Sequence, residues 1–327
     1  MKKFKKIIRA VLVLAVLAGL IYLIPKVITV VRLKRAADSY VAASSVSTFK
    51  DSKTTIIYDT NDQELCTMKN TKDMYYVSYQ EIPVTLVNSF VVMEDRQFYK
   101  HSGYDIKAIL RAIVINQKSN DIAQGASTIT QQLARNVFLS QEVTWQRKVE
   151  EIFIAVGLEK KYSKNQILEF YLNNIYFGNG YYGVEAAARG YFDKSVSELT
   201  LAEQTFIAAI PNNPTRYNPL TNYDNTVQRK NLILQQLYEA DDIGSLDRYM
   251  AETEEVVLNP HQTEEINNSV VTYARHCATE SLMSVSGFTF RYNFSSEDDY
   301  NAYEATYDTF YNMCQQKLLS GGYSIYT

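Results

Sequence analysis

The fold is decided by the stretch Val91-Val92-Met93-Glu94-Asp95-Arg96-Gln97-Phe98-Tyr99-Lys100-His101-Ser102-Gly103-Tyr104-Asp105. Pro83, a residue suited to the first turn of a helix, precedes it, and apolar residues enter it at helical spacing. That spacing predicts that Glu94 and Phe98 share the buried face. A desolvated carboxylate is costly to keep charged, which makes it a useful proton acceptor. The alternative is that Glu94 ends the stripe at the surface or pairs with Arg96 or Lys100.

Length and charge limit the class of protein. At 327 residues, the chain can hold one large domain or two modest ones. Residues 1–35 carry nine Lys or Arg and no acidic residue, whereas residues 221–327 carry 6 basic and 16 acidic residues. Because no basic face is indicated beyond the N-terminus, we do not expect a nucleic-acid partner. The three cysteines and three histidines match no zinc-ligand spacing, so a structural zinc site is not expected.

The N-terminal segment predicts a membrane anchor. Basic residues precede an apolar run that resumes after Lys26, so residues 7–31 are long enough to span a bilayer. The positive cluster should stay in the cytoplasm. We therefore expect a cytoplasmic tail at 1–9, a single transmembrane helix at 10–31 and a stalk at 32–53, with the rest of the chain outside the cell membrane. The alternative is a cleaved signal peptide, because the strictly apolar core is short.

Beyond the stalk, the pattern is mainly α-helical after a small β element. Thr54–Tyr58 and Tyr75–Tyr79 are rich in β-forming residues, and the turn-forming segment Asp59–Asp62 lies between them. Helix start signals of the capping-box type follow. They are Thr128–Gln131, Ser163–Gln166 and Thr200–Glu203.

The C-terminal part predicts helices at 227–240 and 266–282 in an acidic, tyrosine-rich context. Gly321 and Gly322 mark a turn, and the residues after them read as the start of a strand. Since no later sequence supplies a partner for that strand, we expect an interrupted domain.

A second group of residues with chemical potential is Gln124–Asn136. A glycine leads into hydroxyl groups at a helix start, where unpaired N–H groups and the helix dipole favour phosphate. Thr128, Gln131 and Arg135 share one face of that helix. The alternative is an ordinary capped helix with a solvated polar face.

A third group is the run Arg147–Glu151. Arg147 and Glu151 are four residues apart with the basic residue first, which is the less favourable order for helix stability. This order favours a role other than holding the helix, although a surface ion pair is the alternative.

The fourth group is the aromatic-rich run Ile167–Gly178. Asn173 and Tyr176 could bond sugar or phosphate, and a structural polar network is the alternative.

Together these groups resemble the glycosyltransferase domain of class A penicillin-binding proteins and of monofunctional peptidoglycan glycosyltransferases. The shared motifs are Glu-Asp-x-x-Phe-x-x-His-x-Gly, Gly-Ala-Ser-Thr-Ile-Thr-Gln-Gln, Arg-Lys-x-x-Glu and Ile-Leu-Glu-x-Tyr-Leu-Asn, in that order. The resemblance covers about residues 55–225. One departure is Arg135, where Lys is common; Arg keeps the charge but changes the donor geometry.

The resemblance implies a mainly α, lysozyme-like glycosyltransferase domain over 54–245. It would polymerise lipid II into glycan strands at the outer face of the cytoplasmic membrane. By that analogy, Glu94 accepts the proton of the 4-hydroxyl of the acceptor N-acetylglucosamine, which attacks C1 of the donor N-acetylmuramic acid. Undecaprenyl pyrophosphate leaves, and the α linkage becomes β. Glu151, the second catalytic residue, would orient cationic side chains or help to hold a metal ion.

The resemblance also implies the substrate-binding residues, of which Arg135, Arg147 and Lys148 would neutralise the pyrophosphate. The full set is Asp95, His101, Gly125, Ser127, Thr128, Gln131, Gln132, Arg135, Asn136, Arg147, Lys148, Asn173 and Tyr176. No cofactor is required and no metal ligand is assigned, although a divalent cation (Mg²⁺ or Mn²⁺) is compatible with such a site. The expected partners are lipid II, the growing glycan strand, membrane lipids and cell-wall synthesis proteins.

Class A members continue into a transpeptidase, and residues 246–327 are expected to be a linker and its incomplete start. No Lys-Thr-Gly motif is present, so transpeptidase activity is not expected of this chain. Two other functions compete with polymerisation. One is a lysozyme-like muramidase that cuts existing glycan. The other is a non-catalytic membrane scaffold that docks a cell-wall partner through its acidic C-terminal helices.

Overall fold

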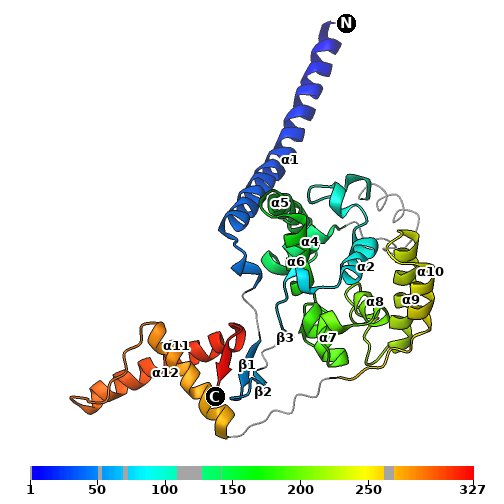
Figure 1. The fold of residues 1–327 in the computed structure, drawn as a ribbon. Helices are drawn as coiled ribbons and strands as arrows, with labels where there is room; N and C mark the ends of the chain where they lie inside the picture. The colour runs from blue at the N-terminus through cyan, green and yellow to red at the C-terminus, as the bar shows by residue number, and fades with distance from the viewer. Residues whose placement is uncertain (1, 51–53, 69–72, 109–126, 141, 261–268) are drawn as a thin grey trace. The chain divides into compact units, whose positions relative to one another are not determined.

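The computed structural model describes residues 2–50, 54–68, 73–108, 127–140, 142–260 and 269–327 (Figure 1). The chain forms two compact units, each made of two sequence ranges. The first unit comprises Met1–Ser44 with Gln97–Ile167, and the second comprises Ser45–Arg96 with Leu168–Thr327. Most of the described residues are helical, which confirms the predicted mainly α fold class.

The first unit is built on α1 (Lys2–Ala43), α4 (Ile129–Phe138) and α5 (Trp145–Lys161), with a 3₁₀ turn at Phe98–Lys100. The C-terminal part of α1 packs along α5. Gly157 allows this close approach, since a Cβ there would lie 2.7 Å from a methyl group of Val41. At the end of α1, the Lys161 ammonium donates to the carbonyls of Val41 (2.7 Å) and Ala42 (3.3 Å), so it caps the helix.

The predicted membrane anchor at 10–31 lies within α1. In the part of the chain that the structure describes, no helix combines the length and the apolar character that a bilayer crossing requires.

The second unit has a helical body in which α8 packs against both α2 and α9, and α10 packs against α9 (Figure 1). Its helices are α2 (Val84–Glu94), α6 (Lys164–Asn174, which begins in the first unit's range), α7 (Val184–Phe192), α8 (Leu201–Ala209), α9 (Tyr223–Glu239) and α10 (Ser245–Thr253). Single 3₁₀ turns lie at Ser47–Phe49, Tyr79–Glu81 and Val196–Glu198. Two short parallel strands, β3 (Asp73–Met74) and β4 (Tyr181–Tyr182), pair beside this body.

A three-stranded sheet lies elsewhere in the second unit, with the order β2-β1-β5. β1 (Thr55–Tyr58) pairs antiparallel with β2 (Glu64–Met68) across the predicted turn, so the expected second strand at 75–79 was wrong. The terminal strand β5 (Ser324–Tyr326) pairs in parallel with β1. The expectation that this strand lacks a partner was therefore also wrong, because its partner lies near the start of the unit.

Two further helices, α11 (Ser269–Val285) and α12 (Glu297–Ser320), pack against each other and against this sheet. Residues 266–268 of the predicted helix 266–282 lie outside the described residues. The sheet and helices share a small apolar core. It contains Ile57, Met68, Val271, Ala274 and Leu318.

The predicted helix starts are confirmed in the hydrogen bonds of α4, α6 and α8. At α8, Thr200 Oγ1 accepts from Glu203 N (3.2 Å), while the Glu203 carboxylate accepts from Thr200 N (2.9 Å). Ser163 and Gln166 make the same reciprocal pair at α6. These caps satisfy N–H groups that have no partner within the helix.

Candidate active site

Glu94 is the last residue of α2. Leu86, Val87 and Phe90 on this helix are buried, and the Glu94 side chain is only 15% exposed. The carboxylate therefore lies on the buried stripe, as the helical spacing predicts. The helix ends there, so the prediction that Phe98 continues the same face was wrong; Phe98 is buried in the separate 3₁₀ turn of the first unit.

The charged neighbour of Glu94 is a residue that the sequence did not single out. Arg229 of α9 places Nη2 4.0 Å from Glu94 Oε1. Arg96 instead donates Nε to the carbonyl of Val92 (3.0 Å). The next residue of α9, Lys230, is fully buried, and burial lowers the pKa of its ammonium group. Two consecutive cations in an otherwise amphipathic helix were the signal that could have identified this position.

In the first unit, the segment after Phe98 lies directly on the backbone of α5. Gly103 has a φ of +100°, and a Cβ there would lie 2.8 Å from the carbonyl carbon of Ala155, so only glycine fits without rearrangement. His101 Nδ1 accepts from the Gly103 N–H (3.1 Å), and the Gly103 carbonyl accepts from Thr128 Oγ1 (2.8 Å). The segment is thus tied to the start of α4.

The start of α4 is a closed capping box. Thr128 Oγ1 accepts from Gln131 N (3.2 Å), and Gln131 Oε1 accepts from Thr128 N (3.1 Å). Both side chains are buried. Gly125, predicted to bind substrate, lies outside the described residues. The helix end therefore has the geometry expected from the sequence.

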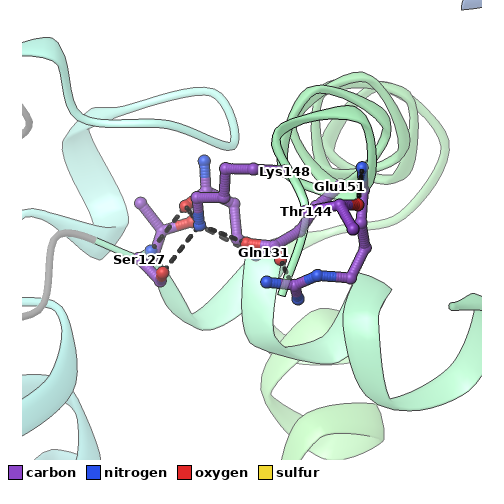
Figure 2. Close-up of polar contacts among 7 residues, drawn as sticks. Ser127, Gln131, Thr144, Lys148 and Glu151 are labelled. Carbon is purple, nitrogen blue, oxygen red and sulfur yellow. Dashed lines mark hydrogen bonds and ion pairs between the residues drawn. The ribbon is translucent and has the colours of Figure 1, made fainter. Parts of the chain in front are cut away.

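A cationic cluster, defined here as Ser127, Gln131, Arg147, Lys148 and Glu151, joins the start of α4 to α5 through hydrogen bonds and ion pairs, and Figure 2 labels all of these residues except Arg147. Lys148 Nζ donates to Ser127 Oγ (2.7 Å) and Gln131 Oε1 (3.3 Å). It also pairs with Glu151, whose other oxygen accepts from Arg147 Nη1 (3.0 Å). Glu151 is fully buried, whereas the side chains of Arg147 and Lys148 are 14% and 37% exposed. One buried anion therefore holds two cations in fixed positions.

The cluster has an excess of hydrogen-bond donors. Gln131 Nε2, Arg135 Nε and Arg147 Nε are buried and have no acceptor among the residues that the structure describes. Buried polar groups are normally paired, so the two spare donors of the cluster, on Gln131 and Arg147, and the third on Arg135 in the next turn of α4 fit an acceptor-rich, anionic ligand. Gln132 and Asn136, also predicted to bind substrate, lie on α4 and are partly exposed.

The same cluster does not fit a metal ion. Both oxygens of Glu151 are engaged by cations, so a metal ligated there would have to displace one of them. Burial raises the pKa of the neighbouring Glu150 carboxyl, which disfavours its charged form. Within the described ranges, no group of three or more His, Cys, Asp or Glu side chains is arranged to hold a metal ion.

Asn173 and Tyr176 of the fourth motif differ in how far their side chains are exposed to a ligand. Asn173 is fully buried. Its Oδ1 accepts from Val77 N (2.9 Å), and its Nδ2 donates to the carbonyls of Val77 (2.9 Å) and Glu169 (2.8 Å). The Asn173 amide is therefore engaged with backbone groups, and its predicted role in substrate binding stays a prediction. Tyr176 is 39% exposed and can contact a ligand.

The sequence of this chain is similar to a known protein family and to several of its members. Residues 61–238 match the family model described as transglycosylase. Penicillin-binding protein 4 from Bacillus subtilis (strain 168) is 43% identical over 212 residues, which cover 65% of this chain and 34% of that protein. Penicillin-binding protein 1A from Aquifex aeolicus (strain VF5) is 43% identical over 198 residues, which cover 61% of this chain and 25% of that protein.

A third relative, penicillin-binding protein 1A from Escherichia coli (strain K12), is 42% identical over 222 residues, covering 67% of this chain and 26% of that protein. The chain thus spans about a quarter to a third of the length of these relatives. A crystal structure of penicillin-binding protein 1A from Haemophilus influenzae aligns with 84% of this chain and 26% of that chain, at 19% identity and a TM-score of 0.41. The family match covers more than half of the residues, and the chain belongs to the transglycosylase family.

Proposed function

We propose that this chain polymerises lipid II into peptidoglycan glycan strands by inverting glycosyl transfer. The observation that carries the proposal is the cationic cluster, in which a buried Glu151 fixes two cations beside spare buried donors. Such a cluster suits a pyrophosphate leaving group. Family membership supports this reading over a muramidase, because a hydrolase acting on existing glycan has no pyrophosphate to bind.

In this proposal Glu94 is the general base. Its carboxylate takes the proton of the acceptor's 4-hydroxyl as that oxygen attacks C1 of the donor's N-acetylmuramic acid. A C–O bond to the acceptor forms, the C1–O bond to pyrophosphate breaks, and the electron pair leaves with undecaprenyl pyrophosphate. A mostly buried carboxylate is poorly solvated, which favours its use as a proton acceptor.

The leaving pyrophosphate gains negative charge in the transition state. Arg147 and Lys148, together with Arg135 and the start of α4, are proposed to bind that charge where it develops. Glu151 acts by orienting the two cations. The remaining proposed contacts to substrate are the other residues that the motifs indicate. They are Asp95, His101, Gly125, Ser127, Thr128, Gln131, Gln132, Asn136 and Tyr176.

We also propose that the reaction takes place at the outer face of the cytoplasmic membrane, in a lysozyme-like domain. The basic N-terminus and the apolar run over 10–31 support a single anchor there. Lipid II, the growing strand and membrane lipids are then the partners, and cell-wall synthesis proteins are candidates for further contacts.

The test uses the full chain in detergent with fluorescent lipid II, and separately with purified sacculi. The expected result is muramidase-sensitive polymer from lipid II and no release of soluble fragments from sacculi. Lys148→Met should lower the rate by about 10²-fold or more, because one donor to the developing charge is lost. Lys194→Met is a matched control, since Lys194 also pairs with a carboxylate (Glu203, 2.6 Å) and is similarly exposed at 41%. Release of fragments from sacculi without polymer would favour the muramidase.

The same assay tests the role of a divalent cation. We propose that no cofactor is required and that Mg²⁺ or Mn²⁺ would only add to charge neutralisation on the substrate. Polymer should therefore still form in EDTA, at a reduced rate. Complete loss of polymer in EDTA, with recovery on adding Mg²⁺, would contradict this proposal.

A further inference from the structure

Arg229 lies beside the proposed base without belonging to any of the four motifs that the sequence singled out. Its side chain is 13% exposed, and its Nη2 atom is 4.0 Å from Glu94 Oε1. That distance is too long for a hydrogen bond but short enough for a direct electrostatic contact. Two charged groups that are both largely removed from water interact more strongly than a surface pair.

The guanidinium group is held in place from a second side. The Tyr217 ring lies under it, with the guanidinium carbon 5.0 Å from the ring centroid. Arg229 Nε is buried and has no hydrogen-bond partner among the described residues, so ring stacking and charge fix the group more than hydrogen bonds do. Arginine is suited to this arrangement because its planar group can stack and stay charged together.

The helix that carries Arg229 is itself anchored. The next residue, Lys230, is 1% exposed and donates to the carbonyl of Ala251 at the end of α10 (2.7 Å). α9 also packs against α2, the helix that ends in Glu94. Arg229 therefore approaches the carboxylate from a rigid support, whereas Glu94 stands at a helix end, where the backbone changes direction.

We propose that Arg229 is a positioning residue that acts through Glu94. Its fixed positive charge holds the carboxylate in one orientation, so that the oxygen that accepts the proton stays in place. This inference rests on the proposed function, in which Glu94 is the base. Because Arg229 is assigned no contact with substrate, its loss should affect the chemical step and not the affinity for lipid II.

The experiment compares Arg229→Gln and Arg229→Lys in the full chain, with fluorescent lipid II as the substrate. Gln removes the charge and keeps a polar side chain, whereas Lys keeps the charge and loses the planar group. Arg229→Gln should lower kcat about 10- to 100-fold with KM changed by less than about threefold, since a misplaced reacting group has effects of this size. Arg229→Lys should recover kcat to within about fivefold of the wild type.

The matched control is Arg248→Gln. Arg248 also pairs with a carboxylate (Glu252, 2.7 Å) and lies over a tyrosine ring (Tyr238, 5.4 Å), but it does so on α10. The Arg248→Gln variant should keep kcat within about twofold of the wild-type value. Thermal melting of each variant separates loss of fold from loss of positioning. If Arg229→Gln does not fold, Arg229→Lys decides, since a more than tenfold loss of kcat at wild-type melting temperature would overturn the proposal.

A double-mutant cycle tests whether Arg229 acts through Glu94. In a Glu94→Gln background, Arg229→Gln should change the residual rate by less than about twofold. An unchanged kcat in the single Arg229→Gln variant, or full additivity in the cycle, would refute the positioning role. If the wild-type chain makes no polymer, the proposed function fails first. If the wild-type chain makes polymer and Arg229→Gln has the same kcat, the proposed function stands and only the positioning role of Arg229 fails.

Discussion

Replacement of Glu151 by Gln removes the anion that holds the cationic cluster together. Gln has nearly the same shape, and its carbonyl oxygen can still accept from Arg147. Its amide nitrogen, however, would face the Lys148 ammonium group, and two donors cannot hydrogen-bond to each other. The negative charge is also lost. The change therefore leaves Arg147 and Lys148 close together without their shared counter-charge, while the packing around position 151 is kept.

The magnitude follows from burial. Removing one partner of a buried ion pair destabilises a protein by about 3–5 kcal/mol. Lys148 is 37% exposed and can turn toward water, so we expect about 2–4 kcal/mol for this site. Glu151 belongs to the first unit (Met1–Ser44 with Gln97–Ile167), a unit of intermediate size for which 1 kcal/mol shifts Tm by about 3–6 °C, so that corresponds to a fall in Tm of roughly 6–24 °C. The rate should fall by about 10²-fold or more, because two donors to the leaving group lose their orientation.

The assay pairs thermal melting with lipid II polymerisation measured well below the Tm. Glu185→Gln is the matched control. Glu185 is also a buried carboxylate, 3% exposed, and pairs with Arg189 (2.7 Å) at the same i,i+4 spacing, with the acidic residue first, but outside the candidate site. Both variants should lose stability, and only Glu151→Gln should lose turnover. Wild-type turnover in Glu151→Gln, or an equal loss in Glu185→Gln, would refute the reasoning.

Three further changes test how the site is supported. Gly103→Ala should destabilise the first unit by about 1–3 kcal/mol, because the new methyl group meets the α5 backbone at a positive φ; an unchanged denaturant midpoint would show that the segment can move aside. Asn173→Ala should cost about 1–3 kcal/mol by leaving the Val77 backbone groups unpaired, with KM for lipid II unchanged; a raised KM at wild-type stability would support its predicted substrate role. Phe49→Ala should cost about 3–5 kcal/mol, since the ring stacks 4.0 Å from that of Phe170, and urea unfolding with a wild-type midpoint would contradict this.

Local sequence patterns predicted those features of the site that depend on residues within a single helix. The burial of Glu94 follows from the spacing of apolar residues in one helix, and the Thr128–Gln131 box follows from residue types three positions apart. The burial of Glu151, by contrast, was not predicted from its i,i+4 pairing with Arg147. It depends on how α4 and α5 pack, which spacing within one helix does not reveal.

Contacts between distant segments could not be predicted in this way. β5 pairs with β1 from the opposite end of the sequence, and no local pattern specifies such a partner. Arg229 approaches Glu94 only because α9 packs against α2. Asn173 lay in a recognisable motif, but its role depends on the backbone of Val77, a residue that no motif contains.

The central claim is that Glu94 removes the proton in glycosyl transfer, and the most direct test is the single-turnover rate of Glu94→Gln with saturating lipid II. Gln keeps the size of the side chain and cannot accept the proton, so the rate should fall by about 10²–10⁴-fold, equivalent to roughly 3–5 kcal/mol of barrier, when it is measured well below the melting temperature of the variant. Polymer formed at the wild-type rate by a folded Glu94→Gln chain would contradict the account.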